Sequence, residues 1–438
     1  MQLTIEKLVY GGDGLARLPA DASGNGKAVF IPFVLAGEEI AATLTEQKPG
    51  FARGRLDAVV RPSAERVSPP CPHFGTCGGC HYQHATYVEQ LRIKTEILGE
   101  NLRRLAKLEL PVEIQVHASS PWNYRNRTRM ALRQERGFEL GYRRMGSEQI
   151  LAVETCPISS PLLQKAMTAL WALGRHGQVP ASLQEVELFA KADDTTLLIS
   201  LFRCGETAKP EAGLESLTSQ LRAALPELET IALFSEREPH RKGQEPEDAR
   251  PQILAGSGFL TYVVSGHSYQ VSAGAFFQSN RHLIPTLVEI VTKSRGGGTA
   301  LDLYAGGGLF SLPLAAQFQS VVAVESAPGS FRDLRRNIPP NAKAVRSTAE
   351  AYLQNATRKL RPDLIVVDPP RAGLGAKATR SLAASCAPRV TYVSCDPATL
   401  ARDLAVLIAA GYGVEEAHLL DLFPQTYHLE TVLHLALS

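Results

Sequence analysis

Four of the seven cysteines in this 438-residue chain have a spacing that could hold a metal. These four are Cys71, Cys77, Cys80 and Cys156. Four thiolates bind either zinc or a [4Fe–4S] cluster, and their spacing alone does not separate the two. Zinc sites often use a second Cys-x2-Cys pair, whereas Cys156 stands alone, which favours the cluster. In a zinc site three nearby histidines would be further ligands: His73, His81 and His84. A redox-active dithiol of Cys77 and Cys80 is another alternative, but it would leave Cys71 without a role.

A fifth cysteine, Cys395, stands where a nucleophile could lie. It follows the apolar run Val390–Ser394 and precedes a helix that we expect to begin near Pro397. The N-terminus of that helix would stabilise a thiolate, which is the reactive form of cysteine. Most free cysteines are small buried apolar residues, so it is position that distinguishes Cys395 from Cys386, which we assign to packing.

A carboxylate near the end of the chain could act as a general base. Glu430 immediately precedes the last apolar run, Thr431–Leu437. A carboxylate at the mouth of a strand can accept a proton from a bound substrate. Taken alone, Glu430 would as readily be a solvated surface residue, so this assignment depends on its neighbours in the fold.

A third group of residues predicts a nucleotide-like cofactor. The buried run Thr299–Tyr304 leads into Gly306–Gly308, where glycines let a ligand approach the backbone. Glu325 ends the next strand, 21 residues after Tyr304, where a carboxylate can bind a ribose diol. Asp368, followed by two prolines, ends another strand at the same edge. The turn lacks the G-x-G-x-x-G spacing of NAD enzymes, so these features favour S-adenosylmethionine over a NAD-type oxidoreductase or an ordinary glycine-rich turn.

These residues need a sheet to bring them together, and residues 271–438 predict one. Apolar strands alternate there with amphipathic helices, as in a mostly parallel α/β sheet. Residues 62–270 predict a mixed α+β domain with the four cysteines and with a helix over 87–108 that could pack on the catalytic domain. Residues 1–61 contain short strand-like runs separated by Gly, Pro and Asp, which is typical of a small β-barrel that could bind RNA.

An arginine-rich stretch indicates where a nucleic acid could bind. Between residues 122 and 144, seven arginines are opposed by Glu135 and Glu139 alone, so the local charge is 7 − 2 = +5. Four aromatic residues interleave with them, and arginines with aromatics suit phosphates and unstacked bases. The alternative is a pair of strands with a solvated arginine face. The arginines are Arg125, Arg127, Arg129, Arg133, Arg136, Arg143 and Arg144.

The composition sets wider limits. With 46 Lys and Arg against 44 Asp and Glu, the formal net charge is +2, which excludes a uniformly basic protein but not a local basic groove. A hydrophobic content of 44% excludes a largely disordered chain. We find no basic segment followed by an apolar one at the N-terminus, and no run apolar enough to cross a bilayer. We therefore expect a cytoplasmic protein with no membrane partner.

Together the motifs resemble those of the RNA (uracil-5-)-methyltransferases, along essentially the whole chain. The chain is most similar to the iron–sulfur branch that modifies 23S ribosomal RNA. The resemblance implies an N-terminal TRAM domain, related to oligonucleotide-binding barrels, a central iron–sulfur domain and a Rossmann-like, S-adenosylmethionine-dependent methyltransferase domain. The motifs are Cys71-x5-Cys77-Gly-Gly-Cys80 with Cys156, Phe276–Asn280, Asp302–Gly308, Asp368–Arg371, Ser394–Pro397 and His428–Glu430.

The resemblance also implies roles for individual residues. Cys395 would be the nucleophile and Glu430 the base, and the cysteines at 71, 77, 80 and 156 would hold a [4Fe–4S] cluster. Two positions depart from the family pattern. Asp396 stands where relatives often have Asn, and Leu309 stands where they often have a polar residue, so one polar contact near the cofactor would be weaker. The residues expected to contact S-adenosylmethionine are Gln278, Tyr304, Glu325 and Asp368.

The expected reaction is methylation of carbon 5 of a uridine in structured RNA. Carbon 5 of uracil is a poor nucleophile, and addition of a thiolate to carbon 6 would activate it. The target base must leave its stack to be reached. We expect 23S rRNA as substrate, with a tRNA uridine as the alternative, and a monomeric enzyme. An iron–sulfur RNA-binding protein without catalysis is the alternative from another class, and the presence of both Cys395 and Glu430 argues against it.

Overall fold

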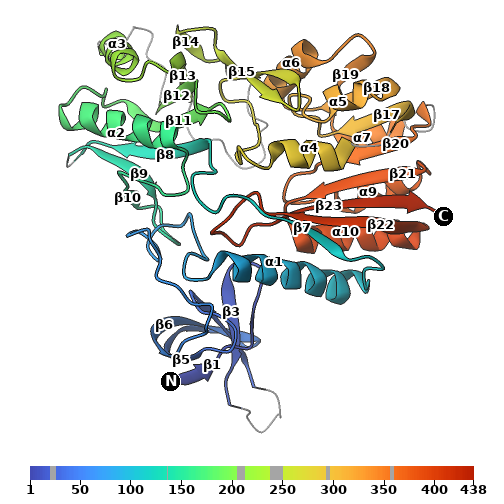
Figure 1. Ribbon diagram of the computed structural model, residues 1–438, viewed down its shortest axis with the longest axis horizontal. Helices are drawn as coiled ribbons and strands as arrows, with labels where there is room; N and C mark the ends of the chain where they lie inside the picture. Colours follow the sequence, from blue (N-terminus) through green and yellow to red (C-terminus); the bar gives the residue numbers. More distant parts are fainter. Residues whose placement is uncertain (20–25, 136, 205–212, 237–249, 293–295, 356–359) are drawn as a thin grey trace.

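The computed structural model describes residues 1–19, 26–135, 137–204, 213–236, 250–292, 296–355 and 360–438. Three sheets dominate it: an N-terminal barrel at the bottom of Figure 1, a central sheet at the upper left and a larger α/β sheet on the right, where the chain ends. Arg136, one of the seven arginines noted above, lies outside the described residues.

The N-terminal barrel contains six strands, and their alternating burial produces its small apolar core. In β4, for example, Val29 and Ile31 are fully buried while their neighbours are partly exposed. The strand β3 is hard to recognise in the sequence, because Gly14 and two charged residues obscure its alternation. Gly14 is required there, since a β-carbon would lie 2.3 Å from a methyl of Val34. In spatial order the strands are β1 (Gln2–Thr4), β5 (Glu39–Gln47), β6 (Phe51–Arg61), β4 (Ala28–Pro32), β3 (Asp13–Arg17) and β2 (Lys7–Leu8).

The central sheet has seven strands and a core of its own. Its helices are α2 (Pro161–Arg175) and α3 (Leu214–Ala224), whose apolar faces pack against it through residues such as Leu163 and Leu217. In spatial order the strands are β10 (Ile150–Ala152), β9 (Glu139–Arg143), β8 (Arg127–Arg133), β11 (Leu183–Ala190), β12 (Leu197–Cys204), β13 (Leu228–Glu236) and β14 (Gln252–Ala255). The hairpin β15 (Phe259–Val264) and β16 (His267–Ser272) leads from it towards the α/β sheet.

The α/β sheet is mostly parallel and is buried on both faces, as its central strands show. All four residues of β20 are buried, which explains their unbroken apolar run. β23 is antiparallel to both of its neighbours. In spatial order the strands are β19 (Ala342–Arg346), β18 (Phe318–Glu325), β17 (Gly297–Leu303), β20 (Leu364–Val367), β21 (Arg389–Ser394), β23 (Glu430–Leu437), β22 (Tyr412–Leu420) and β7 (Ile114–His117).

Helices cover this sheet, and two helical segments come from a distant part of the chain. Leu98 of α1 and Leu102 of η1 share a buried cluster with Leu400 and Leu404 of α10. None of the described helices is long and apolar enough to span a membrane. The helical segments are α1 (Tyr87–Asn101), the π-helix η1 (Leu102–Ala106), α4 (Ile284–Thr292), α5 (Ser311–Ala315), α6 (Pro328–Asn337), α7 (Ala349–Asn355), α9 (Gly375–Ala383) and α10 (Pro397–Ala409).

The domain boundaries drawn from the sequence need two corrections. The predicted central domain, 62–270, includes β7, yet β7 pairs with β22 at the edge of the α/β sheet. The helix α1, which lies in the same range, packs on α10 of the α/β sheet, as we expected it could. In addition, the predicted boundary at residue 271 falls inside β16. Both differences arise from long-range packing, which local periodicity does not report.

Candidate active site and cysteine pocket

The expected nucleophile and base lie next to each other. β21 and β23 are antiparallel neighbours in which Ser394 pairs with Thr431, so Cys395 and Glu430 lie at the same end of this strand pair. Asp368 directly follows β20, which is the neighbour of β21 on the other side. All three groups therefore meet at the carboxyl edge of the parallel strands, where open α/β sheets bind ligands.

Acidic groups crowd this point. Burial, together with the charges of Glu430 and Asp368, raises the pKa of Cys395 to about 12, and Arg371 acts in the opposite direction. Burial and the charge of Asp368 raise the pKa of Glu430 well above its ordinary range. Burial also raises the pKa of Asp368 to about 7. A cation bound among these groups would lower all three pKa values, so the site is suited to a positively charged ligand.

The helix that follows Cys395 does not act as expected. The side chain of Asp396 caps α10, because its Oδ1 accepts hydrogen bonds from the backbone N–H groups of Ala398 (3.0 Å) and Thr399 (2.9 Å). The predicted stabilisation of a thiolate by this helix N-terminus is therefore wrong for the structure as it stands, since Asp396 already occupies these donors. The cation that acts to lower the pKa of Cys395 is Arg371. Its Nη2 also lies 3.3 Å from each ring nitrogen of His428.

The glycine-rich turn lies between the ends of β17 and β18. The N–H of Gly306 donates to Glu325 Oε2 (2.9 Å), and the N–H of Ala327 donates to Oε1 (2.6 Å), so the carboxylate is fixed beside the turn. Gly306 has φ +55°, and a β-carbon there would meet no atom within 4 Å, which leaves open space over the turn. Tyr304 also has a positive φ, +63°, and is half-buried at the end of β17.

The Phe276–Asn280 segment is attached to the loop that precedes Glu430. Asn280 Nδ2 donates to the carbonyl of Leu422 (3.0 Å), and its Oδ1 accepts from the backbone N–H of Leu283 (3.1 Å). Gln278 is 8% exposed, whereas Phe276 is 68% exposed. The segment thus presents one buried amide and one solvent-facing aromatic ring.

Two residues at the ends of the glycine-rich segment, Asp302 and Leu309, differ from what the sequence led us to expect. Asp302 is fully buried, accepts a hydrogen bond from the Ser311 hydroxyl, and has a second oxygen with no hydrogen-bond partner. Burial raises its pKa to about 7. No role for Asp302 follows from the sequence analysis, although a carboxylate within an otherwise apolar strand indicates a buried polar site. Leu309, in contrast, is 9% exposed and packs in the core, so a polar contact to a ligand is not the role of its side chain.

The N-terminal barrel also reaches the active site, which no sequence signal indicated. The hydroxyl of Tyr10, in the β2–β3 turn, donates to the backbone carbonyl of Cys395 at 3.1 Å. Its ring meets that of Tyr427 edge-on, with 5.4 Å between the centroids. Leu8 and Leu429 share a buried cluster at the same junction. The barrel thus packs directly against the residues that flank the nucleophile and the base.

The loop before Glu430 is held by residues that follow the cysteines. The backbone carbonyl of Gln425 accepts hydrogen bonds from the N–H groups of His81 (2.8 Å) and Tyr82 (2.9 Å). The Gln425 side chain and backbone N–H both bond to the amide of Gln90, at 3.0 and 2.9 Å. Gln425 has a positive φ of +68°, so these contacts fix a backbone conformation that is uncommon for residues other than glycine.

The four cysteines expected to bind a metal line one pocket. The pocket has a volume of about 40 Å³, and its other walls are largely apolar. Burial raises the pKa of Cys80 to about 12, and Arg125 acts in the opposite direction. The Nε of Arg125 is itself buried without a hydrogen-bond partner at this pocket. The pocket therefore combines thiols whose pKa values are raised by burial with one cation that partly opposes this rise. The four cysteines are Cys71, Cys77, Cys80 and Cys156.

The spacing of the sulfur atoms bears on what this pocket could hold. Of the described residues, only Glu416, His418 and His434 form a group of metal-ligating side chains whose donor atoms all lie within 4.8 Å of one another. The cysteines are described but form no such group. Thiolates around one zinc ion, with Zn–S distances of about 2.3 Å, would lie about 3.8 Å apart. The four sulfurs of the pocket therefore do not all lie at the spacing of ligands around one zinc ion.

The arginine-rich stretch is less positive than its sequence implied. Arg127 pairs with Glu187 at 2.7 Å, and Arg129 pairs with Glu185, because β8 and β11 are adjacent strands. The expected local charge of +5 counted only the acids within the stretch, and two more come from β11. Arg133 is exposed and lines, with Arg143, an open groove of about 610 Å³ on the central sheet.

Family comparisons cover the whole of this architecture. Residues 86–437 match the family described as tRNA (Uracil-5-)-methyltransferase, and residues 1–56 match the TRAM domain. The chain is 32% identical over 448 residues to a protein of Halomonas elongata named 23S rRNA (uracil(1939)-C(5))-methyltransferase RlmD, covering 99% of this chain and 88% of that one. An uncharacterized RNA methyltransferase of Aquifex aeolicus is 31% identical over 440 residues, covering 99% and 97% of the two chains.

A solved structure shows the same fold. The crystal structure of Pyrococcus abyssi tRNA (uracil-54, C5)-methyltransferase in complex with S-adenosyl-L-homocysteine matches with a TM-score of 0.75 at 22% identity. The match covers 100% of both chains.

Proposed function

The chain belongs to the family of S-adenosylmethionine-dependent RNA (uracil-5-)-methyltransferases, and we propose that it modifies a uridine of 23S rRNA through a covalent adduct of Cys395. The observation that carries the mechanism is the meeting of Cys395, Glu430 and Asp368 at one edge of the sheet, across from an open glycine turn. The rRNA substrate is supported by relatives named for uracil 1939 of 23S rRNA, which match 98–99% of this chain.

The residues around the turn fit the methyl donor. Glu325, fixed by the N–H of Gly306, would accept the ribose hydroxyls, and the open space at Gly306 leaves room for the nucleoside. Gln278, Tyr304 and Asp368 would also contact the donor, as the resemblance to the family implies. When bound, S-adenosylmethionine supplies an electrophilic methyl group on a cationic sulfur. That positive charge suits a site where carboxyl groups repel one another.

Cys395 begins the reaction. Its thiolate forms a bond to carbon 6 of the uracil, and the electrons of the C5–C6 double bond move to carbon 5 and the carbonyl oxygen at position 4. Carbon 5 then forms its bond to the methyl group, and the carbon–sulfur bond of the donor breaks. The thiol has a pKa of about 12 in the structure without ligands, so a cation is needed to favour the thiolate.

Glu430 completes the cycle. Its carboxylate takes the proton from carbon 5, the C5–C6 double bond forms again, and the bond from carbon 6 to Cys395 breaks. A carboxyl with a raised pKa is a stronger base than an exposed glutamate, which suits removal of a weakly acidic proton. The net result is a 5-methyluridine, with the enzyme thiol regenerated.

We also propose that Cys71, Cys77, Cys80 and Cys156 hold a [4Fe–4S] cluster. The support is their shared pocket and the adjacent Arg125. The cluster would fix the loop that bonds to Gln425, and so its role is structural. One chain supplies every group named here, and we propose that it acts as a monomer.

Mapping of 5-methyluridine tests the choice of RNA. Total RNA from cells lacking the gene should lose the modification at one position of 23S rRNA, equivalent to uridine 1939 in the name of the relatives, and should keep it in tRNA. The purified enzyme should then restore it on 23S rRNA from those cells. Loss of 5-methyluridine from tRNA with 23S rRNA unchanged would overturn the proposed substrate but leave the chemistry intact.

A further inference from the structure

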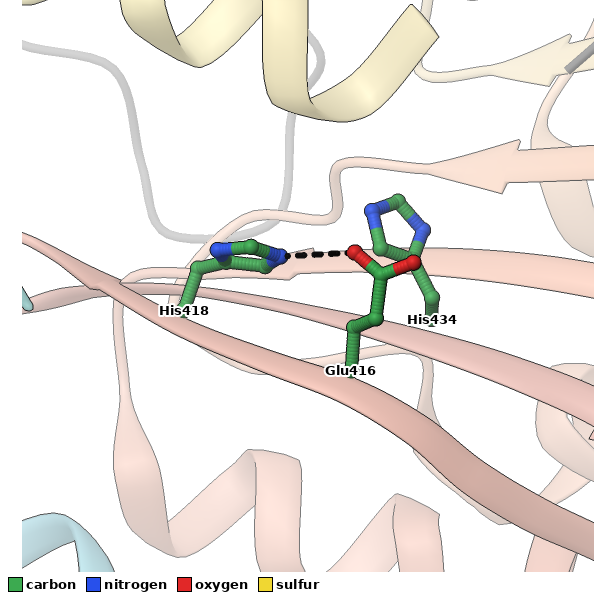
Figure 2. A group of neighbouring side chains, drawn as sticks. All are labelled: Glu416, His418 and His434. Carbon is green, nitrogen blue, oxygen red and sulfur yellow. Dashed lines mark hydrogen bonds and ion pairs between the residues drawn. The ribbon is translucent and has the colours of Figure 1, made fainter. Parts of the chain in front are cut away.

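Three metal-ligating side chains gather on the α/β sheet, away from both sites described above. Glu416 and His418 point to the same face of β22, and His434 on β23 pairs directly with Glu416. A β-bulge between Val414 and Glu416 sets this register. One donor atom from each of the three lies within 4.8 Å of the others. Figure 2 shows the carboxylate of Glu416 lying between the two imidazole rings.

The two imidazoles are oriented as ligating histidines are. Nδ1 of His418 lies 3.1 Å from Nε2 of His117 on β7, and its own Nε2 lies 3.2 Å from Glu416 Oε2. Nδ1 of His434 lies 3.0 Å from the hydroxyl of Thr391 on β21. Metal-bound histidines characteristically use one nitrogen for the ion and fix the other by a hydrogen bond. Here each ring has its Nδ1 fixed, which leaves Nε2 as the ligand atom.

Burial argues against a simple solvated cluster. His434 is 2% exposed and His418 is 5% exposed, so both rings are held in place by packing. Glu416 is partly exposed, with its side chain 45% accessible, and so provides a route from solvent.

We propose that Glu416, His418 and His434 bind one divalent transition-metal ion. Two imidazoles and a carboxylate suit Zn²⁺ and its neighbours in the first row, unlike the thiolate pocket. The ion would link β22 to β23, the strand that begins with Glu430. His434 lies four residues from Glu430, or about 13 Å along the strand. The ion is therefore a structural clamp on the strand that carries the base and takes no part in the reaction.

The test is calorimetric titration of Zn²⁺ into the purified enzyme with its cysteine centre loaded. We expect one Zn²⁺ to bind per chain, and Glu416→Gln to weaken this binding at least tenfold. Since the Glu416 side chain is nearly half exposed, this variant should fold normally, which its unfolding temperature without zinc will show. His418→Gln should give the same loss.

The matched control is His176→Gln, which changes a histidine on an exposed helix end far from the site. It should bind Zn²⁺ as the wild type does. The proposal is overturned by a wild-type protein that binds no Zn²⁺ beyond its cysteine centre, or by Glu416→Gln and His418→Gln variants that bind it with wild-type affinity. In either case the three residues form only a hydrogen-bonded cluster.

Discussion

The chain places cysteines in two environments that differ chiefly in the charges around them. Cys395 lies among carboxyl groups, which raise the pKa of its thiol, whereas the cysteine pocket contains Arg125, which acts in the opposite direction on Cys77 and Cys80. A thiol kept protonated until a cation arrives suits a nucleophile that must react only in the complete complex. Thiols beside a permanent cation suit lasting ligation. Burial raises the pKa of the thiol in both places, and an arginine opposes the rise in both, so the comparison teaches that carboxyl groups are what distinguish the surroundings of Cys395.

The two environments are also connected. Gln425 receives hydrogen bonds from His81 and Tyr82, just after the last cysteine of the loop, and lies five residues before Glu430. Lys94 of α1 and Asp421, both fully buried, form an ion pair at 2.6 Å that anchors the start of the same loop. Changes in the cysteine pocket should therefore reach the active site through the position of Glu430.

The largest effect is expected from Glu430→Gln. This variant keeps the shape of the side chain but cannot take the proton from carbon 5, so turnover should fall by about 10²–10⁴-fold. The methylated adduct with Cys395 should accumulate, and a band of enzyme joined to RNA should appear on a denaturing gel. The matched control is Glu415→Gln, which changes an exposed glutamate on the adjacent strand β22. This variant should have normal turnover. Normal turnover by Glu430→Gln would remove Glu430 from the reaction.

Cys80→Ser should mainly affect the cluster and the stability of the fold, whereas Glu430→Gln mainly affects turnover. It should lose the visible absorbance of the cluster and unfold at a lower temperature, because metal ligation contributes folding free energy. Turnover should fall less than in Glu430→Gln, by roughly 10- to 100-fold, as Glu430 loses its position rather than its chemistry. Cys386 is exposed, so our assignment of this cysteine to packing was wrong, and Cys386→Ser should change neither property. If Cys80→Ser kept a full complement of iron, the pocket would not be the cluster site.

The crowding of carboxyl groups predicts how stability depends on pH. The pKa of Glu430 is raised in the folded protein, so wild-type stability falls as the pH rises from the unfolded pKa of about 4.3 through the folded value. The Glu430→Gln variant has no carboxyl group to ionise at this position, so this fall in stability with rising pH should be absent. Removing roughly 1 kcal/mol of repulsion should raise Tm at pH 8 by about 1 °C, and the gain should vanish near pH 4. Equal Tm values at both pH values would show that the buried carboxylate costs no stability.

The smallest effect is expected from Tyr10→Phe, which tests whether the barrel influences the nucleophile. The variant keeps the ring against Tyr427 and removes only the hydrogen bond to the carbonyl of Cys395. A hydrogen bond worth about 1 kcal/mol corresponds to a fall in kcat of about fivefold. KM for RNA should not change, because the ring stays in place. A rise in KM at constant kcat would assign Tyr10 to RNA binding instead.

Local patterns predicted much of the site. Four strands were readable from their apolar runs, and a parallel sheet necessarily brings such strand ends together. These strands end at or directly before Tyr304, Glu325, Asp368 and Cys395. The glycine turn was equally clear. The cap formed by Asp396 was also readable, since Asp followed by Pro is a common start of a helix, and our expectation of a helix-stabilised thiolate overlooked it.

Long-range contacts were not predictable in this way. Tyr10 and Cys395 are 385 residues apart, and β7 joins the α/β sheet from a segment that precedes the central sheet. The pairing of Arg127 with Glu187 depends on which strands are neighbours, so a count of charge along the sequence overstated the positive surface. Each of these features follows from tertiary packing, which one sequence read locally does not contain.

The central claim is that Cys395 forms a covalent bond to the target uracil, and a 5-fluorouridine substrate tests it most directly. Fluorine at carbon 5 cannot leave as the proton does, so the enzyme should remain joined to the RNA after one methyl transfer. With S-adenosylmethionine present, we expect the wild type to give one stable, methylated protein–RNA adduct per chain, and mass spectrometry of its peptides to place the bond on Cys395. Cys395→Ala should bind the same RNA and give no adduct, while Cys386→Ala should behave as the wild type. A wild-type enzyme that methylates normal RNA yet never traps the fluorinated one, or an adduct that persists in Cys395→Ala, would contradict the proposed mechanism.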